Sequence, residues 1–216
     1  MGVKELEKHS INESIIDSIN DPRVHRYLMF KSFCDFLLAL IGLVITSPII
    51  ILFSIFIRLE SEGPVFYKQE RVGINGKLFY VFKLRSMFIN AEANGAQWAS
   101  KNDPRVTRVG AFIRKTRIDE LPQLLNILKG EMSLIGPRPE RPMFTEKFNN
   151  EIPGFTKRLV VKPGLTGWAQ VNGGYDITAK QKLELDLFYI GKISLRLDTH
   201  ILLKTIRIVI TGDGAR

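Results

Sequence analysis

A run of 22 uncharged residues, from Phe36 to Ile57, constrains the folding of this 216-residue chain more than any other feature. As a straight α-helix at about 1.5 Å per residue it would reach roughly 33 Å, enough to cross the hydrocarbon core of a bilayer. A core helix of such uniform apolarity would be unusual in so small a protein. A cleaved signal peptide fits poorly, because a long and mostly polar segment comes first. The sequence therefore predicts association with a membrane.

The residues themselves leave open whether this run crosses the membrane. Pro48 follows Ser47 near its middle, lacks a backbone N–H and crowds the carbonyl four residues earlier, so it kinks or breaks a helix. Positive-inside counting gives no clear polarity, because basic residues flank both ends of the run: Arg23, Arg26 and Lys31 before it, Arg58, Lys68 and Arg71 after it. A proline-kinked spanning helix and a re-entrant hairpin are equal alternatives on these grounds.

The positive charge of the chain is concentrated after the apolar run. The whole sequence has 31 Lys and Arg against 22 Asp and Glu, a net charge of +9. Residues 1–57 hold 5 basic and 6 acidic residues, whereas residues 58–216 hold 26 and 16. This balance favours a polyanionic partner such as nucleic acid, nucleotide phosphates or an acidic membrane face. Cys34 is the single cysteine, which excludes an intrachain disulfide and a zinc-binding Cys spacing.

Two strand-favouring runs follow in the sequence GPVFYKQERVGINGKLFYVFKLRSM. Asn75 and Gly76 between them are typical of a two-residue β-hairpin turn. Side chains alternate between two faces along the second run, so we expect Lys83 and Arg85 to point together. Paired cations on a strand are usually just solvated, and phosphate binding is the less common alternative.

The stretch RKTRIDELPQ, residues 114–123, is predicted to begin a helix. Five apolar side chains follow at helical spacing: Leu121, Leu124, Leu125, Leu128 and Met132. Asp119 suits the N-cap position, and Pro122 then falls in the first turn, where its missing N–H loses no partner. A Thr116 cap would push Pro122 toward the helix interior. Capping alone would explain an isolated Asp at this position.

The same helix start also suits phosphate chemistry. Its unpaired N–H groups and positive dipole end attract anions. Arg114, Lys115 and Arg117 lie close in sequence, and we expect them to keep Asp119 and Glu120 ionised. An ionised Asp can act as a nucleophile, and an adjacent Glu can hold a divalent cation. The residues permit this chemistry without requiring it.

Two further segments contain candidate binding residues. SLIGPRPERP places Arg138 and Arg141 among three prolines, which restrict the backbone and can aim an arginine at a phosphate at low entropic cost. An ordinary surface loop would account for the prolines equally well. KPGLTGWAQVNGGYD is rich in glycine but has neither the Rossmann nor the P-loop spacing, so it indicates only a structured loop.

Taken in order, these blocks resemble a known family. SPIIILFSIFIRLESEGPVFYKQERVG, FKLRSM, NDPRVTRVGAFIRKTRIDELPQLLNILKGEMSLIGPRPERP and KPGLTGWAQVNG are similar to the bacterial sugar transferases, the monotopic polyprenyl-phosphate phosphoglycosyl transferases. The resemblance covers roughly residues 31–210, and its most specific part runs from DELPQ to GEMSLIGPRP. GPRPERP together with NGGYD resembles the exopolysaccharide branch. KLRSM stands where many relatives read KFRTM, a change that keeps Lys83 and Arg85.

The resemblance implies an enzyme that transfers a sugar-1-phosphate from a UDP-sugar to undecaprenyl phosphate and releases UMP. It implies that Asp119 attacks the sugar-bearing phosphorus to form a covalent phosphosugar intermediate, and that Glu120 binds Mg²⁺. Residues matching the family's substrate phosphate-binding positions are Arg114, Arg138, Lys83 and Arg85. The reaction would be the first membrane step of exopolysaccharide or other glycoconjugate synthesis. UDP-glucose and UDP-galactose are the expected donors, and an N-acetylated sugar is left open.

The implied fold is α+β and mostly helical. We expect a polar leader (residues 1–30), a re-entrant helix-break-helix hairpin in the membrane (31–58) and a catalytic domain (59–216) with a β-hairpin and amphipathic interfacial helices. Ser47 and Pro48 match the break that makes the family's membrane segment re-entrant. The expected location is the bacterial inner membrane, with the catalytic domain on the cytoplasmic face. Because longer relatives carry spanning helices where this chain has a polar leader, we expect a small, stand-alone transferase.

The sequence leaves two alternatives open, one for the C-terminal segment and one for the function. The C-terminal HILLKTIRIVI is either an interfacial helix or a core helix. The alternative to an enzyme is a non-enzymatic, membrane-anchored module that binds polyanions through its basic part. No recognised nucleic-acid-binding motif occurs in the sequence, and the acidic residues are not segregated from the basic ones, so we expect no nucleic-acid partner.

Overall fold

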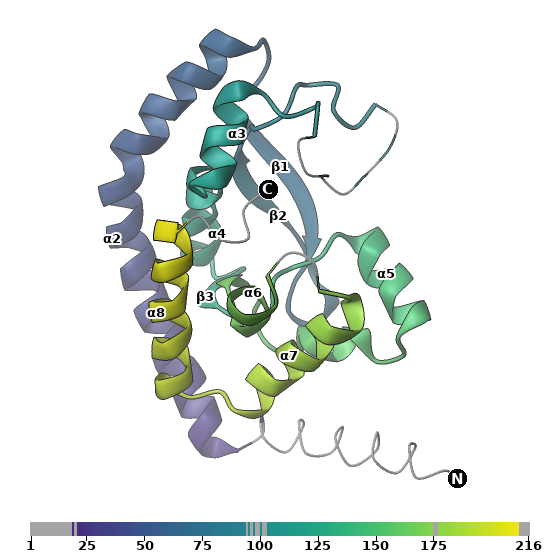
Figure 1. The fold of residues 1–216 in the computed structure, drawn as a ribbon. Coiled ribbons are helices and arrows are strands. Elements are labelled where there is room, and N and C mark those ends of the chain that lie inside the picture. The colour runs from purple at the N-terminus through teal and green to yellow at the C-terminus, as the bar shows by residue number, and fades with distance from the viewer. Residues whose placement is uncertain are drawn as a thin grey trace.

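The computed structural model describes residues 19, 21–93, 95, 97, 100, 103–174 and 177–211. This part of the chain is mostly helical and contains two small two-stranded sheets. One long helix, α2, lies along one side of the molecule, and the other elements all lie to the same side of it (Figure 1). The expected mixed, mostly helical fold is confirmed. Most of the polar leader, residues 1–18 and 20, lies outside the described residues, as do residues 175–176 at the end of the NGGYD segment.

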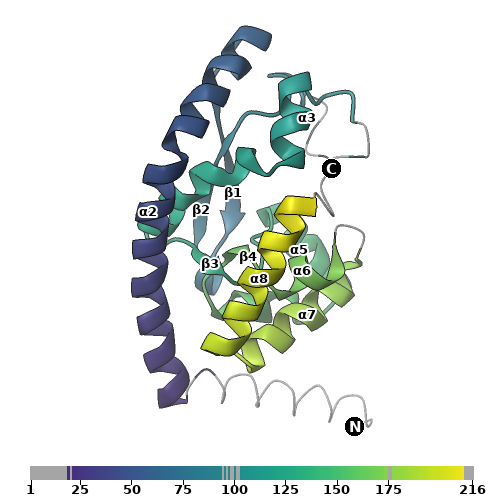
Figure 2. The same cartoon turned by 60° about the vertical axis from the view of Figure 1, so that its left-hand side comes forward.

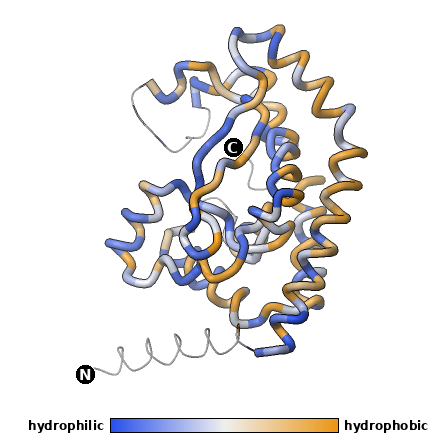
Figure 3. The backbone as a smooth tube through the Cα atoms, turned by 180° about the vertical axis from the view of Figure 1, so that it is seen from behind, coloured by the Kyte–Doolittle hydropathy of each residue, from blue (hydrophilic) through white to orange (hydrophobic). Residues whose placement is uncertain are grey.

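Helix α2 runs from Pro22 to Glu60 and contains the whole apolar run. It therefore begins before the expected start of the membrane segment at residue 31. Asp21 caps it by accepting a hydrogen bond of 2.7 Å from the backbone N–H of Arg23, and Pro22 occupies the first turn. Its most apolar 18-residue window has a mean hydropathy of 2.8, and 6% of that window is buried. Length and composition thus suffice to cross a membrane, and the apolar character is visible along the helix in Figure 3.

The helix continues through Pro48, so the break expected at Ser47 and Pro48 is not seen. Pro48 cannot donate to the carbonyl of Val44, four residues earlier. The hydroxyl of Ser47 donates to that same carbonyl instead, at 2.9 Å. A side-chain donor thereby replaces the missing backbone donor, and α2 curves along the rest of the molecule instead of dividing into two arms (Figure 2).

Both ends of α2 are held by the same folded unit. Near its start, Lys31 pairs with Asp198 of helix α8 (Leu195–Thr211), with 3.0 Å between Nζ and Oδ2. At its end, the Glu60 carboxylate accepts hydrogen bonds of 2.7 and 2.9 Å from the first two amides of helix α3 (Arg108–Lys115). Between these points the helix buries a sparse inner stripe: Ala39, Ile50 and Ile57. The opposite face of α2 is exposed and apolar.

Strands β1 (Phe66–Val72) and β2 (Leu78–Leu84) form the expected antiparallel hairpin. Val72 pairs with Leu78, so five residues connect the strands instead of the expected two. The short 3₁₀ segment η1 (Ile74–Gly76) lies in this connection, and Asn75 has a φ of 53°, in the left-handed region that asparagine tolerates. The inner face of β2 packs against α2 and helix α4 (Leu124–Leu128).

The helix expected from residue 119 is divided into a 3₁₀ segment, η2 (Ile118–Gln123), and α4. Asp119 lies inside the first turn and is not the N-cap, because Arg117 precedes η2 with a left-handed φ of 57°. Leu125, expected on the buried face, is exposed, and Asn126 is fully buried instead. The Asn126 side chain donates to the Tyr80 carbonyl at 2.7 Å and accepts from the Phe82 amide at 3.1 Å, which fixes α4 against β2.

The second half of the fold surrounds a parallel pair of short strands, β3 (Ser133–Ile135) and β4 (Gly164–Thr166). Glycine is required at position 164, where β4 lies close to the backbone after β3, because a Cβ there would lie 2.1 Å from the backbone nitrogen of Gly136. The remaining elements are α5 (Pro142–Glu151), η3 (Phe155–Val160), α6 (Trp168–Gly173), α7 (Ala179–Gly191) and α8. Helix α8 buries Ile201 in the core and leaves Leu203 and Ile206 exposed, so it combines features of both interpretations of the C-terminal segment.

Candidate active site

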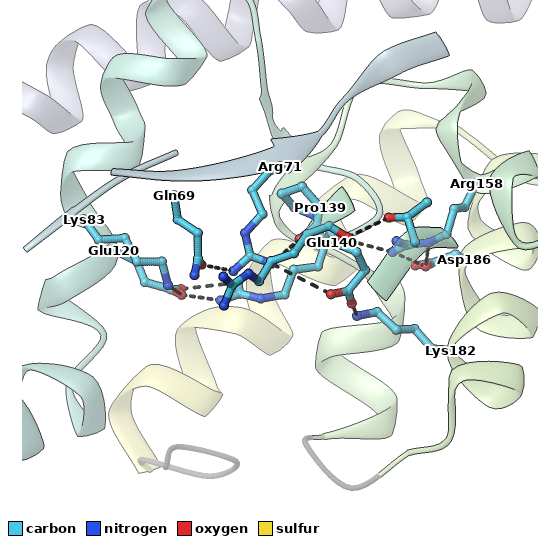
Figure 4. A network of polar contacts seen from close by, with 12 residues as sticks. Gln69, Arg71, Lys83, Glu120, Pro139, Glu140, Arg158, Lys182 and Asp186 are labelled. Carbon is cyan, nitrogen blue, oxygen red and sulfur yellow. Dashed lines mark hydrogen bonds and ion pairs between the residues drawn. The ribbon is translucent and has the colours of Figure 1, made fainter. Parts of the chain in front are cut away.

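Four of the predicted site residues meet where η2, β2 and the β3–α5 loop converge. Figure 4 shows two of them, Lys83 and Glu120, side by side. Lys83 of β2 places its Nζ 2.7 Å from Oε1 of Glu120 and 3.9 Å from Oδ2 of Asp119. Arg138 of the loop donates to the same Glu120 carboxylate from both of its terminal nitrogens. Two adjacent carboxylates thus face two cations that come from distant parts of the sequence.

Arg85 does not join this group, contrary to the expected pairing of Lys83 with Arg85. Strand β2 ends at Leu84, so the alternation that aims Lys83 at η2 does not continue to Arg85. The Arg85 guanidinium instead donates to the carbonyls of Ser61 and Glu62, just beyond the end of α2. Its contacts are those of a structural residue that closes the C-terminal end of a helix.

The remaining arginines differ in their relation to the carboxylates. Arg114 lies in the last turn of α3, and its positive charge partly opposes the rise that burial gives to the pKa of Asp119, which places it within electrostatic range. Arg141 pairs with Glu92, at 2.8 Å between Nη1 and Oε1, and lies over the ring of Phe144. Of the two arginines in the proline-rich loop, Arg138 therefore lies at the carboxylate pair and Arg141 does not.

The two adjacent carboxylates have opposite pKa shifts. Burial raises the pKa of Asp119 to about 6, although the charge of Lys83 opposes the shift. Burial also acts to raise the pKa of Glu120, but Arg138 and Lys83 outweigh it and hold that pKa well below its usual value. The main cations that keep Glu120 ionised are therefore Arg138 and Lys83, in place of the expected Arg114, Lys115 and Arg117. For Asp119, burial shifts the balance toward the protonated form.

This arrangement is suited to attack on a phosphorus atom. Among the described residues, no hydrogen bond holds the Asp119 carboxylate, and its polar contact is the 3.9 Å ion pair with Lys83. Above its pKa it is an ionised, poorly solvated carboxylate, which is a stronger nucleophile than a hydrated one. Lys83 and Arg138 lie close enough to neutralise phosphate oxygens brought to the same place.

The two carboxylates, Asp119 and Glu120, are also the candidate ligands for a metal ion. No cluster of three or more His, Cys, Asp or Glu side chains suited to a metal occurs among the described residues. Mg²⁺ commonly binds through one or two carboxylates together with substrate phosphates, which is compatible with this pair. Glu120 is ionised and fits such an ion, on condition that it shares its oxygens with Lys83 and Arg138.

A second polar network, which the sequence did not predict, lies beside the first (Figure 4). Arg158 of η3 pairs with Asp186 of α7, with 2.7 Å between Nη2 and Oδ2, and Lys182 of α7 pairs with Glu140. Arg158 and Asp186 are 2% and 1% exposed. One feature of the sequence could have indicated this network. Lys182 and Asp186 are four residues apart, so they share one face of α7, and the apolar residues around them suggest that this face is buried.

Comparison with known proteins shows which family and which named proteins this chain resembles. The bacterial sugar transferase family matches residues 26–212. A Bacillus subtilis (strain 168) protein provisionally named undecaprenyl-phosphate N-acetylgalactosaminyl 1-phosphate transferase is 68% identical over 134 residues, which are 62% of this chain and 75% of that protein. An Aeromonas hydrophila protein named UDP-N-acetylgalactosamine-undecaprenyl-phosphate N-acetylgalactosaminephosphotransferase is 50% identical over 193 residues, which are 88% of this chain and 46% of that protein.

A Xanthomonas campestris pv. campestris protein named UDP-glucose:undecaprenyl-phosphate glucose-1-phosphate transferase is 40% identical over 189 residues, or 85% of this chain and 39% of that protein. The chain therefore spans less than half the length of the Aeromonas and Xanthomonas relatives. The matched region contains the cluster of Lys83, Asp119, Glu120 and Arg138. Because the family match extends over nearly all of the described chain, this protein belongs to the bacterial sugar transferase family of enzymes.

Proposed function

We propose that this enzyme transfers a sugar-1-phosphate from a UDP-sugar to undecaprenyl phosphate and releases UMP, with Asp119 as the nucleophile. The observation that carries the proposal is the buried Asp119 carboxylate, which is held beside Lys83 and next to the salt-bridged Glu120. The names of the relatives support the same general reaction for this chain. The product would be the first membrane-bound intermediate of an exopolysaccharide or another glycoconjugate.

The proposed reaction has two displacements at one phosphorus atom. An Asp119 oxygen attacks the sugar-bearing phosphorus of the UDP-sugar, the bond from that phosphorus to the bridging oxygen breaks, and UMP leaves with that oxygen. A phosphate oxygen of undecaprenyl phosphate then attacks the same phosphorus. The bond to Asp119 breaks and the carboxylate is restored. Lys83 and Arg138 neutralise the phosphoryl oxygens, and Arg114 adds positive charge nearby.

Glu120 is the proposed protein ligand for Mg²⁺. A bound Mg²⁺ would neutralise the negative charge of the diphosphate. The low pKa of Glu120 supports this role, because the carboxylate is ionised at every pH at which the enzyme would work. Its contacts with Lys83 and Arg138 also keep those two cations beside the place that substrate phosphates would occupy.

The decisive test is UMP release by purified protein with undecaprenyl phosphate and Mg²⁺. The relatives with 68% and 50% identity are both named for N-acetylgalactosamine, so UDP-N-acetylgalactosamine comes first in the donor panel, followed by UDP-glucose, UDP-galactose and UDP-N-acetylglucosamine. We expect release of UMP with at least one donor, dependent on the lipid acceptor. Absence of release with every donor, together with salt-sensitive binding of a polyanion, would support the non-enzymatic alternative.

The structure supports a structural role for Arg85 in this reaction scheme, not a phosphate-binding role. Arg85→Gln would lose charged hydrogen bonds to the Ser61 and Glu62 carbonyls, so we expect the free energy of unfolding to fall by about 1–3 kcal/mol. We expect the Michaelis constant for the UDP-sugar to change less than about twofold. Thermal unfolding and steady-state kinetics measure the two effects. A large rise in the Michaelis constant without loss of stability would instead indicate that Arg85 binds a substrate phosphate.

We also propose that both ends of α2 lie on the cytoplasmic face of the inner membrane. Both ends contact one folded unit, which supports a monotopic arrangement over a spanning one. Cysteines can be introduced at the exposed positions Arg23 and Glu62 after the single native cysteine, Cys34, is replaced by serine. We expect a membrane-impermeant maleimide to label both positions in inverted vesicles and neither in intact spheroplasts. Labelling of one position from each side would show that α2 spans the membrane.

A further inference from the structure

The loop that carries Arg138 is held through its backbone. Four consecutive carbonyls, those of residues 137–140, each accept a hydrogen bond from a different donor. The donors are Gly164 N to Pro137 O at 3.0 Å, Arg158 Nη2 to Arg138 O at 2.7 Å, Arg71 Nη1 to Pro139 O at 3.1 Å, and Val72 N to Glu140 O at 2.9 Å. These donors come from β4, η3 and β1, so three separate elements fix one short loop.

The sequence of the loop explains why outside donors are needed. Pro137 and Pro139 have no backbone N–H, so this segment cannot pair with itself or join a regular strand ladder. Buried carbonyls without a partner would cost free energy. The donors satisfy these carbonyls and fix the path of the backbone. The Arg138 side chain can then reach Glu120 with little remaining freedom.

The hydrogen bond to the Arg138 carbonyl comes from a buried, charged side chain. Its donor, Arg158, is a fully buried charge, and a buried charge is tolerated only with a partner. Asp186 supplies that partner by accepting from Nε at 2.8 Å and pairing with Nη2 at 2.7 Å. The Arg158 guanidinium therefore has one orientation, in which Nη2 also meets the Arg138 carbonyl. One helical turn earlier on α7, Lys182 pairs with Glu140 at the other end of the loop.

We propose that Arg158 and Asp186 are positioning residues that set the Arg138 guanidinium against the reacting groups, through the backbone carbonyl of Arg138. Neither side chain reaches Asp119 or Glu120, so their effect on the reaction passes through Arg138. A displacement of about 1 Å in a catalytic group can cost about 10²-fold in rate, so such support matters for turnover. The inference rests on the proposed function only for its kinetic readout.

A double-mutant cycle on turnover tests this coupling. We expect Asp186→Asn to lower kcat by about 10- to 100-fold in the wild-type background and by less than about twofold in an Arg138→Gln background. Arg158→Lys, which keeps the charge but loses the forked geometry, should behave in the same way and serves if the Asp186 variant does not fold. Equal losses in both backgrounds, with the fold intact by thermal unfolding, would overturn the proposal.

Tyr27→Phe is the control. It lies near the start of α2 and loses a 2.8 Å hydrogen bond to Asp198 of α8, away from the loop. Any effect of this variant on kcat should be the same factor in both backgrounds, because it acts only through general stability. A dependence on Arg138 as strong as that of Asp186→Asn would show that the coupling is not specific, and would overturn the proposal.

A readout without turnover separates this inference from the proposed function. The amides of Gly164 and Val72 donate to the loop carbonyls, so their hydrogen exchange reports on the loop directly. We expect exchange at both amides to accelerate more than tenfold in Asp186→Asn and to stay unchanged in Tyr27→Phe. If the wild-type protein releases UMP from no donor, the proposed function fails while this test still stands. Unchanged exchange in a folded Asp186→Asn variant would overturn the inference alone.

Discussion

Asp119→Asn is expected to lower UMP release by at least about 10³-fold, because the amide can neither attack the sugar-bearing phosphorus nor serve as a leaving group. Asparagine has nearly the same shape as aspartate, so the buried site should keep its packing. The rate of UMP release at saturating donor and acceptor measures this loss. Turnover within a few-fold of the wild type would remove Asp119 from the role of nucleophile.

The same variant has a second expected result that shows whether the fold is intact. Burial raises the pKa of Asp119 to about 6 in the folded protein, against an ordinary value of 3.8, so folding favours its protonated form. The associated stability is present below the unfolded pKa and is lost as the pH rises through about 6. Above that pH the buried charge costs on the order of 3 kcal/mol.

Asparagine is neutral at every pH and avoids this cost. Asp119→Asn should therefore unfold at a higher temperature than the wild type at pH 8, and the difference should shrink at pH 5. Thermal unfolding in one detergent at the two pH values measures it. A variant that is inactive and less stable at pH 8 would indicate that the substitution damages the site, not the chemistry alone.

Glu120→Gln is expected to change stability in the opposite direction. The substitution leaves Lys83 and Arg138 without their shared counter-charge, and breaking such a buried pair typically costs about 3–5 kcal/mol. We also expect kcat to fall by at least about 10²-fold and the Mg²⁺ dependence of the remaining activity to change. Thermal unfolding and Mg²⁺ titration of UMP release measure these effects.

Glu120→Asp is the control for charge. It keeps the negative charge and shortens the side chain, so it should recover much of the stability while remaining impaired in turnover. A folded Glu120→Gln variant with an unchanged Mg²⁺ titration would contradict the role of Glu120 as a metal ligand. The opposite stability effects at two neighbouring acids would also distinguish their environments, which the sequence alone presents as equivalent.

The sequence predicted those features that depend on local patterns. Alternation and the Asn75-Gly76 pair indicated the hairpin, and the composition of residues 36–57 indicated the long apolar helix. The family resemblance brought Lys83, Asp119, Glu120 and Arg138 into one prediction, and the structure places these four together. Such signals work because a strand period, a turn dipeptide or a sequence motif is contained within a few residues.

Other features depended on contacts between distant segments. Asn126 replaces Leu125 on the buried face because it bonds the backbone of β2, which no helical pattern reveals. Arg85 leaves the alternation because its strand ends one residue earlier, beside the end of α2. Pro48 differs, because its compensation is local: the Ser47 hydroxyl donates to the Val44 carbonyl that the proline cannot serve, in a helix that continues to Glu60.

The attachment of α2 to α8 has a consequence for biosynthesis. Tyr27 donates to Asp198 at 2.8 Å across 171 positions of sequence, and residues near the start of α2 share a hydrophobic cluster with Ile201 of α8. At about 5–20 residues per second, a ribosome needs roughly ten to thirty seconds between the two segments. Throughout that interval the residues near the start of α2 lack these partners in α8. Early delivery of the nascent helix to lipid would therefore guard the unfinished chain against aggregation.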